Sequence, residues 1–257
     1  FTWTFSGLLT MTPWNLFPSA GPTRSQVEAI RGEGLDLTGF TLSPVDAVNA
    51  LRGRFQPKEL ELTQFMGTPF YAAYERPDVS ARPHQDAARY APDDEAPSRV
   101  FVSAGSGGAG IRQGFTQDEL LTAARSAMGG MDPTEVTWLT AYDSYYYDRT
   151  GGRHLPALRA KFDDPDGTWL YLDSTDGAIA LAEVRGSRAE RWLYQGLHSL
   201  DFPGLYQSRW AWYPLIIGLS LGGVALSLTS LVIGWRVLRA KVWPFAQPAR
   251  VSVRQSA

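Results

Sequence analysis

The stretch HLPALRAKFDDPDGTWLYLDSTDGAIALAEV, residues 154–184, largely decides the fold of this 257-residue chain. It holds three runs in which apolar residues alternate with other residues. They are separated by the turn sequences Asp164-Pro165-Asp166-Gly167 and Ser174-Thr175-Asp176-Gly177. An Asp-Gly pair between alternating apolar runs is a strong hairpin signal. The stretch therefore predicts an antiparallel meander with strands at 154–162, 168–173 and 178–184.

A helix and a further strand are predicted just before this meander. In FTQDELLTAARSAM (115–128), Thr116 stands at an N-cap position and Glu119 follows three residues later, which is a capping box. The run EVTWLTAY (135–142) has the composition of a strand. The same order occurs at 43–76, where Ser43 and Pro44 begin a helix and two strand-like runs follow. We therefore predict an α+β fold.

The repeated order suggests an internal duplication. A first helix-plus-antiparallel-sheet repeat is expected over residues 13–99 and a second over 100–186, with a short extra helix at 24–31. Within the first repeat, residues 77–99 are rich in proline and charge and lack apolar periodicity, so they are expected to form an exposed excursion.

A long uncharged segment lies near the end of the chain. The 26 residues from Trp210 to Trp235 contain no charge, and about 20 apolar residues suffice to cross a bilayer core. Aromatic residues at both ends match the interfacial belts of spanning helices, with Trp210, Trp212 and Trp235 as anchors. We predict a transmembrane helix over 209–237.

A second membrane segment is expected at the start of the sequence. The apolar run FTWTFSGLLTM is interpreted as the end of a truncated first transmembrane helix, residues 1–12. The tail 238–257 is basic, and the residues from Arg236 onward carry five basic side chains and no acid. Positive flanks stay in the cytoplasm, so the C-terminus is expected there and the main domain in the periplasm. The 21 Arg against 3 Lys favour a GC-rich genome and hence a bacterial inner membrane.

Between the meander and the span, residues 187–208 are expected to form a juxtamembrane helix with Ser187 as N-cap. Its apolar face contains Trp192, Leu193 and Leu197. Two interpretations stay open: the helix rests at the membrane interface with Trp192 as an anchor, or it covers the meander.

These features resemble the membrane-anchored PepSY-domain proteins. The resemblance rests on KFDDPDGTWLYLDSTDGAIALAEVRGSRAERWLYQGLHSLDFPGLY (161–206), on GLSLGGVALSLTSLVIGWRVLR (218–239) and on the opening run (1–11). It implies tandem PepSY-like repeats between two transmembrane helices. Soluble PepSY modules are associated with inhibiting or chaperoning peptidases. Related proteins with more membrane helices include ferric or ferric-siderophore reductases that bind haem through transmembrane histidines. This chain departs from that second group, because it has one complete span and no histidine in the given part of its first helix.

Composition excludes several classes of function. There is no cysteine and the net charge is −2, so thiolate chemistry and a protein devoted to neutralising nucleic-acid phosphates are excluded. No catalytic or metal-binding constellation is recognised, and His84 and His154 are expected at the surface. The glycine motif at 105–110 lacks the following helix that a dinucleotide site needs, so it is interpreted as a connector between the repeats. The aspartates around the two Asp-Gly turns are expected to be solvated, with a weak cation site as the alternative.

Three further sets of candidate residues remain. Tyr142, Tyr145, Tyr146 and Tyr147 could form a binding surface or pack on the meander. His198 is a candidate haem ligand, with a capping or interfacial role as the alternative. Small residues in the span allow close helix packing, against the first helix or a partner subunit: Gly218, Gly222, Gly223, Ser227, Ser230 and Gly234.

The sequence therefore predicts a non-enzymatic, membrane-anchored accessory subunit without a required cofactor. Its partners would be other membrane-protein subunits and the lipid bilayer. The alternatives are a haem-binding electron-transfer component of ferric or ferric-siderophore reduction and a regulator of a periplasmic peptidase.

Overall fold

The computed structural model describes residues 7, 21–75, 99–147, 153–196, 200, 202, 205 and 208–242. The chain divides into two compact units, Phe1–Tyr194 and Gln195–Ala257. The predicted excursion at 77–99 lies outside the described residues except for Arg99. The predicted first membrane helix lies outside them except for Gly7.

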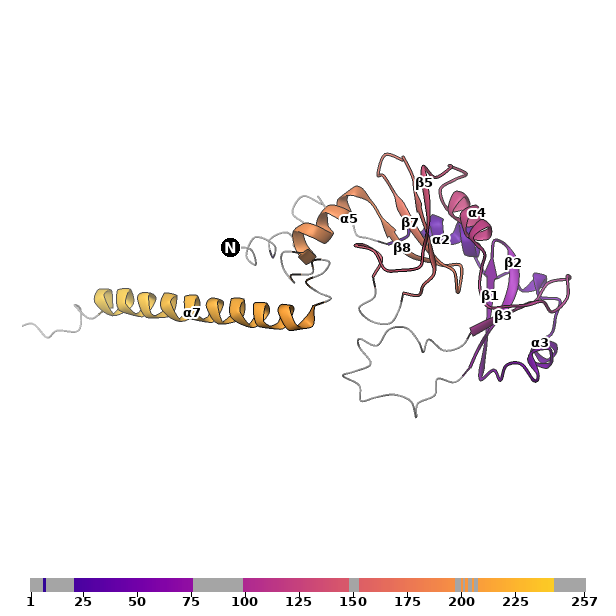
Figure 1. Ribbon diagram of the computed structural model, residues 1–257, viewed down its shortest axis with the longest axis horizontal. Coiled ribbons are helices and arrows are strands. Elements are labelled where there is room, and N and C mark those ends of the chain that lie inside the picture. The colour runs from indigo at the N-terminus through magenta and orange to yellow at the C-terminus, as the bar shows by residue number, and fades with distance from the viewer. Residues whose placement is uncertain are drawn as a thin grey trace, which may run out of the picture. The chain divides into compact units, whose positions relative to one another are not determined.

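The first unit begins with a four-stranded antiparallel sheet in the order β1-β2-β3-β4 (Figure 1). The strands are β1 (Glu59–Phe65), β2 (Thr68–Tyr74), β3 (Arg99–Ser103) and β4 (Ile111–Arg112). A two-residue turn joins β1 to β2, and both of its residues, Met66 and Gly67, have positive φ (51° and 75°). A two-residue turn with positive φ at both positions has a backbone twist that matches the twist of the two strands it connects.

The helix α3 (Pro44–Leu51) covers one face of this sheet. Ser43 caps it as predicted, because its hydroxyl accepts the backbone N–H of Asp46 at 3.2 Å. The buried side chains Ala47 and Leu51 pack with the β2 and β3 residues that point toward the helix. The 3-10 turn η2 (Leu37–Gly39) precedes α3.

The second sheet confirms the predicted meander. Its order is β5-β6-β7-β8 and every neighbouring pair is antiparallel. The strands are β5 (Glu135–Leu139), β6 (Ala157–Lys161), β7 (Trp169–Asp173) and β8 (Ile179–Glu183). Both Asp-Gly sequences occupy the predicted turns, and Gly167 and Gly177 have positive φ.

Two helices lie side by side between the sheets: α2 (Arg24–Arg31) and α4 (Gln117–Ala127) (Figure 1). Both begin with a capping box, Thr23 with Gln26 and Thr116 with Glu119. The Ser126 hydroxyl donates to the Ala29 carbonyl at 3.4 Å, which ties α4 to α2.

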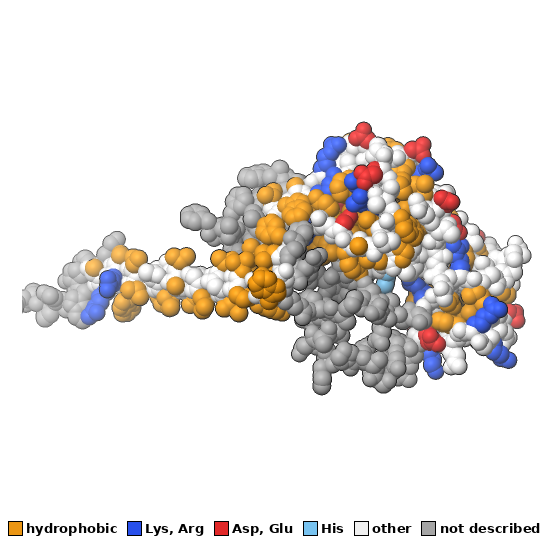
Figure 2. Space-filling view, viewed as in Figure 1, with side chains coloured by type: hydrophobic (Ala, Val, Ile, Leu, Met, Phe, Trp, Pro, Cys, Tyr) orange, Lys and Arg blue, Asp and Glu red, His pale blue; other side chains and the backbone are white. Residues whose placement is uncertain are grey.

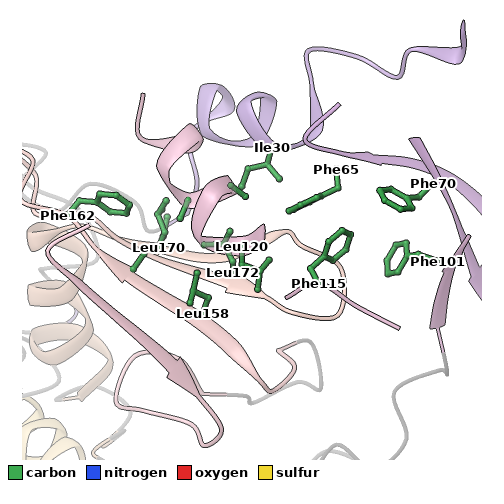
Figure 3. Close-up of a cluster of buried hydrophobic side chains, with 14 of the residues drawn as sticks. Ile30, Phe65, Phe70, Phe101, Phe115, Leu120, Leu158, Phe162, Leu170 and Leu172 are labelled. Atoms are coloured by element: carbon green, nitrogen blue, oxygen red, sulfur yellow. The ribbon is translucent and has the colours of Figure 1, made fainter. Parts of the chain in front are cut away.

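The unit Phe1–Tyr194 has two halves, one built around each sheet, and one apolar core joins them. Phe115, just before α4, packs its ring 4.1 Å from that of Phe65 in the first sheet. Leu120 of α4 and Leu158 and Leu170 of the second sheet complete the same cluster (Figure 3). The two halves therefore form one packed unit.

The first sheet extends past the boundary predicted at residue 99. Strand β3 begins at Arg99 and pairs with β2, and β4 then pairs with β3. The division between the halves thus lies between Arg112 and Gln117. Among the described residues, α3 and α4 are each followed by four strands that pair in sequence order.

The helix after β8 begins earlier than predicted. Helix α5 spans Arg185–Glu190 and continues into the π-helical turn η5 (Arg191–Gly196). Ser187 is therefore not its N-cap. It lies in the first turn, where its hydroxyl accepts the backbone N–H of Val184 at 2.9 Å and donates to Glu183.

The second unit contains α7 (Arg209–Val242), a continuous helix of 34 residues. Its segment Trp210–Ala240 contains an 18-residue stretch with a mean hydropathy of 2.1, none of it buried, so the helix is long and apolar enough to span a membrane. Apolar side chains line the visible face of α7, and basic side chains are visible toward its C-terminal end (Figure 2). The helix runs past residue 237, so the start of the predicted basic tail is helical.

Candidate functional site

A cluster of aromatic and arginine side chains covers the face of the second sheet opposite to α4. We call it the aromatic–arginine cluster. Its members come from the loop after β5, from β6 and β7, and from α5 and η5: Tyr145, Tyr147, Arg153, Arg159, Trp169, Arg188, Arg191 and Trp192. Alternation along the strands creates this face, since Leu158 and Leu170 point toward α4 while Arg159 and Trp169 point the other way.

Trp169 of β7 is at the centre of the cluster. The Lys161 ammonium and the Arg188 guanidinium each lie 4.3 Å from its ring centroid. The attraction of a cation to an aromatic face contributes about 0.5–1 kcal/mol at exposed sites and more when desolvated. Because Arg188 belongs to α5, Trp169 holds this helix against the sheet.

A second contact joins the π-helical turn to the same place. The Trp192 indole N–H donates to the Tyr145 hydroxyl at 3.0 Å. The Tyr145 ring stands edge-on to both Trp192 and Trp169, with centroid distances of 6.0 and 5.4 Å. Trp192 is half-buried in this contact, so the helix packs on the meander, as one of the two compatible interpretations expects.

Asp143 shapes the tyrosine loop. One carboxylate oxygen accepts the backbone N–H groups of Tyr145 and Tyr146 at 2.8 and 2.6 Å. The other accepts from Arg159 at 2.9 Å and from the Tyr171 hydroxyl at 3.2 Å. The loop is thereby tied to strands β6 and β7.

The four tyrosines do not form one surface. Tyr146 is fully buried, stacks on Tyr171 at 5.3 Å and donates its hydroxyl to the His154 carbonyl at 2.8 Å. It is a core residue, and the prediction of a binding surface is wrong for it. Burial raises the pKa of Tyr146 and of Tyr171. Tyr145 and Tyr147 are half-buried, and Tyr142 is exposed.

Two arginines complete the cluster. Arg153 donates to the backbone carbonyls of Tyr145 and Tyr147 at 3.2 and 3.0 Å. The guanidinium of Arg191, a buried residue, lies 4.8 Å from the Tyr147 ring centroid and 5.2 Å from that of Trp192. These contacts join the tyrosine loop to η5.

A buried carboxylate, Glu183 at the end of β8, lies beside the first turn of α5. Burial raises the pKa of Glu183, which accepts a hydrogen bond from Ser187. Arg188 donates to the Gly167 carbonyl at 2.8 Å, and burial lowers its pKa. The cluster therefore fixes α5 and η5, which precede α7 in the chain, on the second sheet. Its cationic side chains lie against aromatic rings or bind carboxylates and backbone carbonyls.

His154 differs from the surface residue that was predicted. Its Nδ1 lies 2.8 Å from an oxygen of the buried Asp173, and a quarter of its side chain is exposed. The other two histidines, His84 and His198, lie outside the described residues. Within the described residues, no three histidine or acidic side chains are grouped so that they could hold a metal ion.

The glycine motif at 105–110 lies inside the first sheet. It forms the connection of the β3–β4 hairpin, where the Ser103 N–H donates to the Gly110 carbonyl at 2.8 Å. It is therefore not a connector between the halves. The antiparallel strands on either side cannot provide the strand–helix turn of a dinucleotide site.

The small residues of α7 fall on two faces. At about 100° per residue, Gly223, Ser227, Ser230 and Gly234 lie within about 60° of one another around the helix axis. Gly218 and Gly222 lie about 150° and about 110° from the centre of that group. A Cβ built on any of these four glycines would meet no heavy atom within 4 Å. The predicted anchors Trp210 and Trp235 are 82% and 64% exposed, and Trp212 is half-buried.

No protein-family model matches this chain, and neither a curated protein nor a solved structure matches it.

Proposed function

We propose that the chain is a membrane-anchored accessory subunit. In this proposal α7 crosses a bacterial inner membrane and the two-sheet unit binds or stabilises a partner of a larger membrane complex. The observation that carries it is α7 itself, whose apolar side chains are exposed along its length; Leu226 and Leu231, for example, are each 71% exposed. A helix with such a surface needs lipid or another helix around it.

The orientation follows from charge. Arg236 and Arg239 stand in the last turns of α7, whereas the apolar part holds no charge. The positive end is expected in the cytoplasm, and in this proposal the two-sheet unit is therefore on the periplasmic side. The common order of helix and four strands in each half supports a tandem PepSY-like domain.

The two small-residue faces of α7 suggest how it would pack. One face could contact a neighbouring membrane helix and the other a partner subunit, because small residues let helix backbones approach closely. The aromatic–arginine cluster fits the same role, since it holds the segment before the membrane helix firmly on the domain.

The test is purification of the full-length protein from native membranes in mild detergent, followed by the mass of each co-eluting species. We expect stoichiometric membrane-protein companions. Gly222→Leu and Ser227→Leu fill one face each and serve as controls for one another, so a partner that uses one face is lost from only one variant. A monomer without companions would contradict the proposal.

The same preparation separates the two alternatives. A Soret band that disappears in His198→Ala would indicate the haem-binding electron-transfer component instead. A periplasmic peptidase among the companions, retained by both α7 variants, would indicate a peptidase regulator.

A further inference from the structure

The turn between β7 and β8 is the joint between the two halves. It lies against the first half so closely that two glycines are required there. A Cβ on Gly177, whose φ is +70°, would lie 2.6 Å from the Phe65 ring, and a Cβ on Gly114 would lie 2.5 Å from the Ser174 carbonyl oxygen. The Phe115 N–H donates to that same carbonyl at 2.7 Å.

A chain of polar contacts crosses this joint. The Nδ1 of His154 lies 2.8 Å from one oxygen of Asp173, whose other oxygen accepts the Thr175 N–H and hydroxyl, each at 2.7 Å. The Thr175 hydroxyl in turn accepts from Arg99 of the first sheet at 2.7 Å. Arg99 also lies 3.6 Å from the carboxylate of Asp176.

Negative charge is crowded in this small volume. The side chains of Asp173 and Asp176 are 5% and 24% exposed, and only Arg99, itself 18% exposed, makes an ion pair to them from the first sheet. The other titratable groups facing Asp176 are the exposed Arg31 of α2, which favours its charge, and Tyr146. Burial, and then the charge of Asp173, raise the pKa of Asp176 above its usual 3.8.

We propose that this joint is proton-sensitive: it is tightest when Asp176 holds a proton beside Asp173, and it loosens when rising pH removes that proton. With the proton on Asp176, the two carboxyl groups carry a single negative charge between them, which Arg99 balances. Without it, two carboxylates repel each other in a poorly solvated site.

The direction follows from proton binding. A carboxyl whose pKa is higher in the folded state holds its proton to a higher pH there than in the opened state. The opened state therefore loses its proton first as pH rises from about 4, and the closed joint is progressively destabilised until Asp176 also ionises. Each unit of pKa difference corresponds to about a tenfold change in the opening equilibrium.

The chain offers a matched control for this position. Asp176 and Asp166 are both the third residue of an Asp-Gly turn, but Asp166, in the β6–β7 turn, is exposed. Asp176→Asn imitates the protonated state at the joint, whereas Asp166→Asn makes the same change at the surface. His154→Gln keeps a hydrogen-bond donor for Asp173 and leaves the Asp173–Asp176 pair intact, so it is a second control.

The experiment is hydrogen exchange of the full-length protein in detergent from about pH 4, near the usual pKa of an aspartate, up to about pH 7.5, read by mass spectrometry and corrected for intrinsic exchange. The peptide with Phe115 reports the joint and the peptide with Leu158 reports the second sheet. We expect protection at Phe115 to fall several-fold in the native protein, in Asp166→Asn and in His154→Gln, and to stay level in Asp176→Asn, with Leu158 level in all. An equal fall at Phe115 in all variants, or an equal fall at Leu158, would overturn the proposal. Neither result depends on the accessory role.

Discussion

Trp192 in the π-helical turn and Tyr145 in the loop after β5 are joined by a hydrogen bond of 3.0 Å from the indole nitrogen to the phenol oxygen. The two residues are far apart in sequence. Their contact fixes the last segment of the two-sheet unit on the outer face of its second sheet.

Removing this hydrogen bond should destabilise the unit modestly. Tyr145→Phe keeps the ring contacts with Trp169 and Trp192 but leaves the half-buried indole N–H without this acceptor, at a cost of about 1 kcal/mol. Urea unfolding of the protein in detergent, followed by circular dichroism, measures the loss. Trp210→Phe, at an 82% exposed position, should lower the free energy of unfolding by much less. Equal losses in the two variants would show that the Trp192–Tyr145 hydrogen bond contributes nothing to stability.

Gly177→Ala should be among the most damaging small changes. Its positive φ is strained for alanine by about 1 kcal/mol, and the added Cβ would lie 2.6 Å from the Phe65 ring, which adds an overpacking cost of about 1–3 kcal/mol. Gly53→Ala has a similar φ of +79° but open space around it. The difference between the two variants in free energy of unfolding isolates the clash, and no difference would mean that the joint is loosely packed.

Glu119 should make the unit sensitive to acid. Its hydrogen bonds with Arg112, and then those with Thr116, lower the pKa of this carboxyl to about 2. Since the folded pKa is depressed, the stabilisation is present above about pH 4.5, its usual pKa, and is lost as pH falls toward 2. The side chain is 37% exposed, so screening leaves about 1–2 kcal/mol. Glu119→Gln should lose that stability at pH 7 and gain a flatter unfolding profile between pH 5 and 2.5. A profile as steep as that of the native protein would contradict this assignment.

Membrane retention should depend on depth along α7. Leu226→Arg places a charge near the middle of the apolar segment, which costs about 2.5–3.5 kcal/mol of insertion. Leu238→Arg places the same charge beside Arg239, where the side chain reaches the interface. Alkaline extraction of membranes should release more of the first variant than of the second. Equal extraction of both would argue against a span centred on Leu226.

Local chemistry was sufficient to predict most of the elements. The caps at Ser43 and Thr116 and the two Asp-Gly turns depend on residues three or four apart, so the sequence contains them directly. The uncharged run from Trp210 to Trp235 likewise predicts a long apolar helix without reference to any other part of the chain.

The tertiary structure decided what those elements contact. The pairing of β3 and β4 with the first sheet, the burial of Tyr146 against Tyr171, and the link from His154 through Asp173 and Thr175 to Arg99 all join distant residues. In the sequence, the polar residues among them cannot be distinguished from those of solvated loops, because burial depends on how the whole unit packs and not on the local sequence. The sequence by itself therefore determined the elements and the apolar segment that can span a membrane. Only the tertiary packing brought the Asp-Gly turn between β7 and β8 into contact with the first half.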